Sequence, residues 1–165
     1  MRIEQIYITY SESIFQFIYF IVGDEQLAKD LTQETFIKAM QGSHNFRGQA
    51  SEKTWLIKIA RNLAYDYFRR EKILKFIPFL KEHEQIDYTY SPEPWLVNKS
   101  EQYELYEAIG KLPYSYREAI VLRKIEGYSI KESALILGWS EVKVKNATER
   151  GMKKLGEFLG GEQDA

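Results

Sequence analysis

The sequence predicts an all-α fold made of two small helical domains with a linker between them. Apolar residues recur at three- and four-residue steps through most of the chain, which is the period of a helix with one buried face. No stretch alternates convincingly between apolar and polar residues as a strand would. Pro78, Pro92 and Pro94 fall together in a stretch without a sustained period. We therefore assign residues 1–75 to the first domain, 76–99 to the linker and 100–160 to the second domain.

Composition excludes several classes of protein. The 165 residues suffice for a buried core, and they include no cysteine, which excludes disulfides, thiolate catalysis and cysteine-bound zinc. Residues 14–22 are apolar but too few to span a bilayer, and Glu4 stands where a signal peptide would be basic. We therefore expect a cytoplasmic protein with no direct membrane insertion.

Charge divides the chain into three parts. The net charge is +2 over residues 1–80, −5 over 81–107 and +2 over 108–165. Two mildly basic blocks thus flank an acidic middle, which indicates two surfaces and a linker.

The first domain opens with two predicted helices, 3–22 and 25–41. Gly23 breaks the first, and Asp24 can cap the second. The buried stripe of the second helix consists of Leu27, Ala28, Leu31, Thr35 and Ala39. Its other side carries Asp30, Gln33, Glu34 and Ile37, which form either a docking surface or a solvated face.

A polar loop at 42–50 precedes a long predicted helix at 51–75, which Ser51 caps. In the loop, Phe46 and Arg47 lie between two glycines, where they could hold an extruded base or simply close a turn. The buried side of the helix is predicted to hold Trp55, Leu56, Ile59, Ala60, Leu63 and Tyr67.

The remaining surface of the same helix carries basic, amide and phenol side chains: Lys58, Arg61, Asn62, Tyr65, Arg69 and Arg70. These residue types suit phosphate and base contacts. A solvated helix whose basic end complements the helix dipole would have the same composition.

The second domain opens with a predicted helix at 100–112, which Pro113 ends. Ser115 and Glu118 have the spacing of a capping box, so we expect another helix from there to Glu126. Gly127 ends that helix.

Two further helices follow with a tight turn between them. Ser129 and Glu132 form a capping box at the start of the first, and Gly138 ends it. Ser140 can cap the second helix, on which Val144, Thr148, Gly151, Leu155 and Phe158 face inward.

Its opposite side carries Lys143, Asn146, Glu149, Arg150 and Lys153. Small Ala134 lets the helices approach, and Val144 fills the angle between them. This is the layout of a DNA-binding helix-turn-helix, although an αα-hairpin with a solvated polar face would look similar.

No catalytic motif stands out. The sequence has no glycine-rich phosphate loop, no zinc-binding histidine pair and no nucleophile elbow, and His44 is far from His83 in the chain. We therefore expect no enzyme activity, no catalytic residue, no metal site and no cofactor.

Three groups of motifs, in order, carry a resemblance to a known family. The first is Asp-Leu-Thr-Gln-Glu-Thr-Phe-Ile-Lys at 30–38. The second is Phe-Arg-Gly at 46–48, Lys-Thr-Trp-Leu at 53–56, Ile-Ala-Arg-Asn at 59–62 and Asp-Tyr-Phe-Arg-Arg at 66–70. The third is Leu-Pro at 112–113, Arg117, Leu-Arg at 122–123 and the helix-turn-helix. Over almost the whole chain, these motifs resemble bacterial sigma factors of the extracytoplasmic-function (ECF) group.

The resemblance implies a sigma region 2 in the first domain and a sigma region 4 in the second. Contact with the β′ clamp of RNA polymerase is implied for Asp30, Leu31, Gln33, Glu34, Phe36, Ile37 and Lys38. A pocket for a flipped base of the −10 element is implied for Asn45, Phe46, Arg47, Gly48, Gln49, Ala50 and Ser51. Further −10 contacts are implied for Lys58, Arg61, Asn62, Tyr65, Arg69 and Arg70, while Trp55 stays assigned to the core.

Reading of the −35 element is implied for Ser140, Glu141, Lys143, Lys145, Asn146, Glu149, Arg150 and Lys153. The implied partners are core RNA polymerase, through its β′ clamp and β flap, promoter DNA, and an anti-sigma factor of the kind that is often membrane-anchored. The implied function is to direct the polymerase to specific promoters and to aid initiation.

The recognition helix departs from the family pattern. Residues 143–151 read Lys-Val-Lys-Asn-Ala-Thr-Glu-Arg-Gly, where many relatives have Thr-Val-Lys, a central Arg and then Arg-Ala. Glu149 would repel phosphate unless it accepts a hydrogen bond from a cytosine amino group.

Two other classes of function remain as alternatives. One is a stand-alone helix-turn-helix transcriptional regulator that binds duplex DNA without polymerase, and the other is a helical adaptor with no role on DNA. A free-standing repressor needs neither the 30–38 motif nor the 45–51 loop, which favours the sigma factor.

Overall fold

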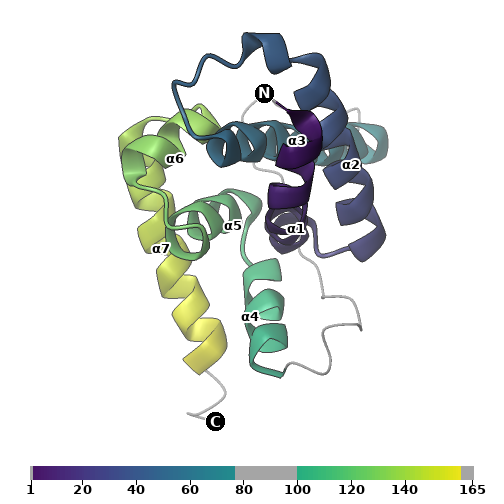
Figure 1. Cartoon of the computed structure of the whole chain (residues 1–165). Helices are drawn as coiled ribbons and strands as arrows, with labels where there is room; N and C mark the ends of the chain where they lie inside the picture. The colour runs from purple at the N-terminus through teal and green to yellow at the C-terminus, as the bar shows by residue number, and fades with distance from the viewer. Residues whose placement is uncertain (1, 77–99, 161–165) are drawn as a thin grey trace.

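The computed structural model describes residues 2–76 and 100–160 (Figure 1). In chain order the helices are α1 Ile3–Val22, α2 Glu25–Gln41, α3 Glu52–Phe76, α4 Ser100–Gly110, α5 Tyr114–Ile120, α6 Ile130–Leu137 and α7 Glu141–Gly160. The described residues contain no strand, so the all-α prediction is confirmed. Residues 77–99, most of the predicted linker, lie outside the described part.

Helix α1 lies at the centre of the molecule (Figure 1). Ile14, Phe17 and Ile18 are buried in its C-terminal half, where the sequence is apolar nearly all round. It packs against α2 and α3 on one side and against α4 and α5 on the other. One helix therefore contributes to the cores of both domains.

Local signals placed most helix ends correctly. Gly23 adopts φ 71°, and the Asp24 carboxylate accepts a hydrogen bond from the amide of Leu27 at 2.8 Å. Ser129 and Glu132 form the predicted capping box, in which each side chain accepts from the backbone amide of the other. Gly138 adopts φ 69° in the turn between α6 and α7.

The predicted capping box of Ser115 and Glu118 is wrong. Pro113 occupies the N-cap position of α5, so Ser115 falls inside the helix and its buried hydroxyl has no hydrogen-bond partner. Glu118 points into the protein interior instead. Helix α5 ends at Ile120, and a wider π-helical turn, Val121–Ile125, follows it.

Arg117 of α5 connects the ends of two helices. Its side chain is fully buried and donates to the carbonyl oxygens of Ile21, Gly110 and Leu112 at 2.7, 3.0 and 3.2 Å, and to that of Ile109 at 3.3 Å. These carbonyls belong to the last turns of α1 and α4 and to the turn after α4, where the backbone has no helical donor. The positive charge also complements the negative end of each helix dipole.

Two glycines of α7 give a matched test of this packing. A Cβ atom at Gly151 would stand 2.8 Å from Cγ1 of Ile120, whereas one at Gly156 would meet no atom within 4 Å. We expect Gly151→Ala to lower the free energy of unfolding by about 1 kcal/mol, because overpacking outweighs the better helix propensity of alanine. Gly156→Ala should raise it by about 0.5–1 kcal/mol. Urea titrations measure both, and equal stabilisation would contradict the close approach of α7 to α5.

Candidate nucleic-acid interface

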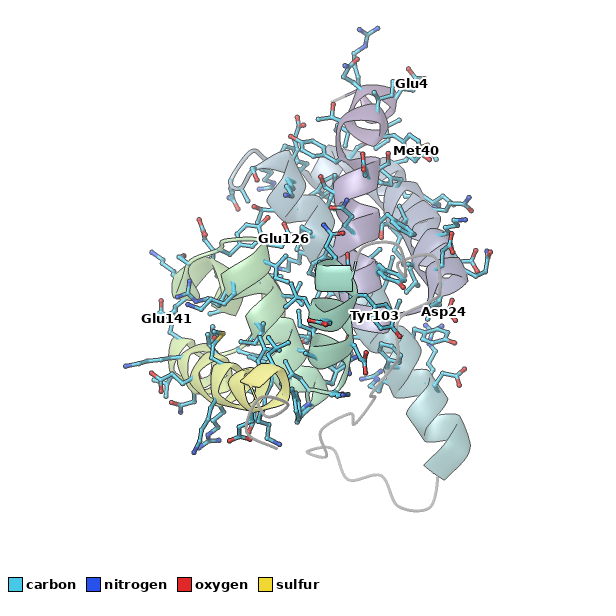
Figure 2. All side chains as sticks on the ribbon, turned by 90° about the horizontal axis from the view of Figure 1, so that it is seen from below. Glu4, Asp24, Met40, Tyr103, Glu126 and Glu141 are labelled. Carbon is cyan, nitrogen blue, oxygen red and sulfur yellow. The ribbon has the colours of Figure 1, made fainter. Side chains whose placement is uncertain are left out.

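The outward face of α7 is a basic and polar surface. Its eight candidate −35 residues are all exposed: Ser140, Glu141, Lys143, Lys145, Asn146, Glu149, Arg150 and Lys153. Figure 2 shows Glu141 at the outer edge of the molecule, where the helix begins. The other side of the helix is buried against α5 and α6 through Val144, Ala147 and Gly151. Packing therefore fixes which side faces outward.

The start of α7 is held firmly. The Ser140 hydroxyl accepts from the amide of Lys143 at 3.1 Å, as its sequence position predicted. The Lys143 ammonium lies 4.2 Å from the centroid of the Trp139 ring, a cation–π contact that orients this side chain beside the turn. A shallow hollow next to it is lined by Ser115 and Tyr116 of α5 together with Asn146 and Arg150.

The second candidate surface is the loop between α2 and α3. A short 3₁₀ helix, Ser43–Asn45, starts it, and Gly48 turns the chain with φ 71°. The Ser51 hydroxyl accepts from the amide of Thr54 and so caps α3. Beside the loop lies a hollow of about 730 Å³, lined by all the candidate loop residues except Gly48 and by Lys58.

Trp55 packs against the core, as predicted, and also lines this hollow. The ring is half-buried and lies 5.1 Å, between centroids, from the ring of Phe46. It lines both this hollow and a second one, of about 360 Å³, that also contains Asn45 and Asn62. Trp55, Ile59 and Leu63 share one side of α3, as their helical spacing predicted. This side lies at the edge of the core, where Trp55 and Ile59 are only half-buried.

Arg61 is buried, although the sequence predicted it on the surface of α3. Its Nε and Nη2 atoms donate to the two carboxylate oxygens of Glu118 in α5 at 3.1 and 3.0 Å. The guanidinium also lies 4.5 Å from the centroid of the Tyr65 ring, and Nη1 donates to the Asn62 amide oxygen at 3.3 Å. The other candidates on this helix, Lys58, Asn62, Arg69 and Arg70, are exposed, and Tyr65 is half-buried.

Electrostatics favour the charged form of Arg61 in this pair. Burial lowers the pKa of Arg61, but the Glu118 carboxylate outweighs that effect and the net pKa is raised. Burial raises the pKa of the Glu118 carboxyl, and the Arg61 guanidinium offsets part of that rise. The bidentate geometry is the form in which arginine binds carboxylates most strongly.

A second buried stripe of α3 accounts for the position of Arg61. Ile57, Ala64 and Phe68 are buried on the same side of the helix as Arg61, at three- and four-residue steps. These residues were missed as core positions because the first stripe already supplied a complete buried face. The helical spacing of the apolar residues Ile57, Ala64 and Phe68 in the sequence could have identified this second stripe.

The candidate polymerase-binding residues of α2 divide into exposed and buried ones. Asp30, Gln33, Glu34, Ile37 and Lys38 are exposed, whereas Leu31 and Phe36 lie in the core of the first domain. Ile37 and Phe36 border an apolar groove of about 560 Å³ between α1 and α2. Glu4 and Met40, which also line this groove, lie close to each other in Figure 2.

Other kinds of site are not found in the described residues. Within residues 2–76 and 100–160, no group of three His, Asp or Glu side chains is arranged to hold a metal ion. In the same ranges, every helix is too short or too polar to cross a membrane.

Comparison with known proteins gives a family match for each part of the chain. The family described as Sigma-70 region 2 matches residues 6–73, and the family described as Sigma-70, region 4 matches residues 102–155. The ECF RNA polymerase sigma factor SigX of Bacillus subtilis is 36% identical over 158 residues, which cover 93% of this chain and 81% of that protein. The RNA polymerase sigma factor YlaC of the same organism is 32% identical over an alignment that covers 93% of this chain and 89% of that protein.

Solved structures show the same fold. The sigma factor RpoE of Bartonella quintana, in its complex with the anti-sigma factor NepR, aligns with a TM-score of 0.74 at 23% identity, over 95% of this chain and 96% of that one. CnrH, in its complex with the cytosolic domain of CnrY, aligns with a TM-score of 0.69 at 23% identity, over 96% of this chain and 88% of that one.

The two matched regions are those of a transcription initiation factor. The chain belongs to the ECF group of RNA polymerase sigma factors. It therefore acts with RNA polymerase in transcription initiation, and the two alternatives, a stand-alone regulator and a helical adaptor, are set aside.

Proposed function

We propose that the two domains divide promoter recognition between them, with the loop and α3 reading the −10 element and α7 reading the −35 element. The observation that carries this division is the presence of two outward surfaces of DNA-binding chemistry on separate domains. One combines the exposed Lys58, Asn62, Arg69 and Arg70 with the loop hollow. The other is the basic stripe of α7.

The chemistry of each surface suits a different form of DNA. The hollow beside Phe46 and Trp55 is bordered by aromatic rings, on which an unstacked base can stack. Flipping a base out of the duplex costs a few kcal/mol, which such contacts offset. The α7 stripe is straight and helical, so it fits the major groove of intact duplex.

Docking on the polymerase is proposed for the exposed side of α2 and the groove beside it. Acidic Asp30 and Glu34 flank an apolar surface to which Ile37 contributes with half of its area exposed. Such a surface combines an apolar centre with a polar rim, as protein interfaces do. The β′ clamp is the proposed partner there, and the β flap is the proposed partner of the second domain.

The protein is further proposed to work without covalent chemistry of its own, in the cytoplasm, where its polymerase is found. An anti-sigma factor is a proposed additional partner, because the structural neighbour RpoE was solved in complex with the anti-sigma factor NepR.

Run-off transcription tests the proposed function. Purified core polymerase transcribes a pool of genomic fragments with and without the chain. We expect start sites that appear only with the chain and share two elements at a fixed spacing. No new transcripts, together with tight duplex binding by the chain alone, would overturn the proposal.

Arg150→Ala tests the −35 surface. If Arg150 contacts a base, its loss should weaken promoter binding by the holoenzyme by about 1–3 kcal/mol. Lys111→Ala is the control, because Lys111 is also exposed but directly follows α4, outside the α7 stripe. Equal promoter affinity of Arg150→Ala and wild-type holoenzyme would rule out that role.

Phe46→Ala tests the loop hollow. Base stacking on an aromatic ring is worth about 1–3 kcal/mol, so this variant should bind single-stranded −10 DNA in the holoenzyme about tenfold less tightly or worse. Phe46→Tyr keeps the ring and should retain most of the affinity. Fluorescence anisotropy measures both, and an equal loss in the two variants would show that stacking is not the contribution of this residue.

A further inference from the structure

The outward side of α7 carries a carboxylate between basic side chains. Helix α7 runs along an outer side of the molecule, where it is the yellow helix of Figure 1. Glu149 is exposed on it, and its basic neighbours Lys145, Arg150 and Lys153 are exposed as well. On a surface proposed to lie against a polyanion, a carboxylate is repelled unless it finds a hydrogen-bond donor. The donor that suits Glu149 therefore indicates what this part of the helix binds.

Glu149 has no such donor within the part of the chain that the structure describes. Across residues 2–76 and 100–160, its carboxylate takes part in no ion pair or side-chain hydrogen bond. Lys145 and Lys153 lie four residues before and after it, which is the spacing of ion pairs along a helix. Glu25 and Lys29 of α2 do form such a pair, at 3.0 Å. The carboxylate of Glu149 is thus available to a ligand.

The chemistry of the major groove decides which base a carboxylate can bind. Guanine presents its O6 and N7 atoms there and thymine presents O4, and all three are acceptors, to which a carboxylate cannot hydrogen-bond. Adenine presents an amino donor, but its N7 acceptor lies beside that donor. Cytosine presents the N4 amino group as its hydrogen-bonding group. Cytosine is therefore the base that a carboxylate binds best.

The position of Glu149 along α7 suits a contact with a base. Asn146 is exposed three residues earlier, on the same side of the helix, and its amide is also a group that can bind base edges. Three residues of helix rise by about 4.5 Å, close to the spacing of about 3.4 Å between base pairs, so the two side chains can reach neighbouring pairs. The basic residues around them can bind phosphates, which offsets the repulsion between Glu149 and the DNA backbone.

We propose that Glu149 is a specificity-determining residue that accepts a hydrogen bond from the N4 amino group of a cytosine in the −35 element. This inference rests on the proposed role of α7 in reading that element. A different base at the same position leaves the carboxylate without a donor at the DNA surface, which is costly. Glu149 therefore selects cytosine and also rejects the other bases, whereas a basic residue at this position would strengthen binding to many sequences.

Selection from a pool of promoter duplexes with a randomised −35 element tests this contact. Holoenzyme is reconstituted from core polymerase and the full chain, wild type or variant, and the bound duplexes are sequenced. With the wild-type chain, we expect cytosine to be preferred about tenfold over the other bases at one position, within the usual range for a single base contact.

Two substitutions of Glu149 have different expected results. Glu149→Ala should abolish the preference at that position alone, and it should bind sequences without the cytosine more tightly than wild type, because a repulsive carboxylate is gone. Glu149→Gln should change the preference at that position from cytosine to adenine, because an amide side chain pairs with the N6 and N7 atoms of adenine. Both variants should fold, because the side chain is exposed, and circular dichroism checks this.

Glu157→Gln is the matched control. Glu157 is exposed on the same helix, about two turns beyond Glu149, and its substitution removes the same charge. This variant should keep the wild-type base preference at every position. If Glu149→Gln and Glu157→Gln both strengthen binding to all sequences alike, Glu149 is only a solvated surface charge and the proposed contact is overturned.

The outcomes separate this contact from the proposed function. A wild-type −35 preference that neither Glu149 variant changes would overturn the cytosine contact alone. So would a change confined to a position where the wild type does not select cytosine. A wild-type holoenzyme without any −35 preference would instead overturn the proposed role of α7, and the contact with it.

Discussion

The buried cluster of Arg61, Arg117 and Glu118 is the constraint on which the arrangement of the helices depends. Two guanidinium groups and one carboxylate are almost completely removed from water, and each must be satisfied by protein groups. Glu118 accepts from Arg61, whereas Arg117 donates to four backbone carbonyls at the ends of α1 and α4. Moving any of these helices would leave a buried charge without its partner, so the cluster fixes α1, α3, α4 and α5 relative to one another.

The same cluster lies where the two domains meet. Polar and apolar groups share this contact: Arg61 binds Glu118, and the ring of Phe20 on α1 stacks on that of Tyr106 on α4 at 3.8 Å between centroids. The cores of the domains depend on apolar packing, such as that of Ile14 and Ile18 on α1. The buried charges therefore add specific partners to helices that otherwise pack through apolar side chains.

Sequence reasoning succeeded where structure is determined by near neighbours. The ends of α1, α2 and α6 follow from Asp24, Gly23 and the Ser129–Glu132 capping box, all local signals. It failed where a partner lies far along the chain. Ser115 and Glu118 have capping-box spacing, but Pro113 takes the cap position and Glu118 finds Arg61, 57 residues away. The exposed stripe of α7 was predictable from periodicity, whereas the burial of Arg61 required knowledge of which helix covers α3.

A double-mutant cycle between Arg61 and Glu118 tests the importance of this cluster most directly. Urea unfolding is measured for wild type, Arg61→Met, Glu118→Gln and the double variant. Because each single change leaves a buried charge or polar group without its partner, the two losses should be strongly non-additive, with a coupling free energy of about 1.5–3 kcal/mol. Additivity within about 0.5 kcal/mol would show that the two side chains do not depend on each other and would contradict the role of the cluster as the constraint joining the two domains.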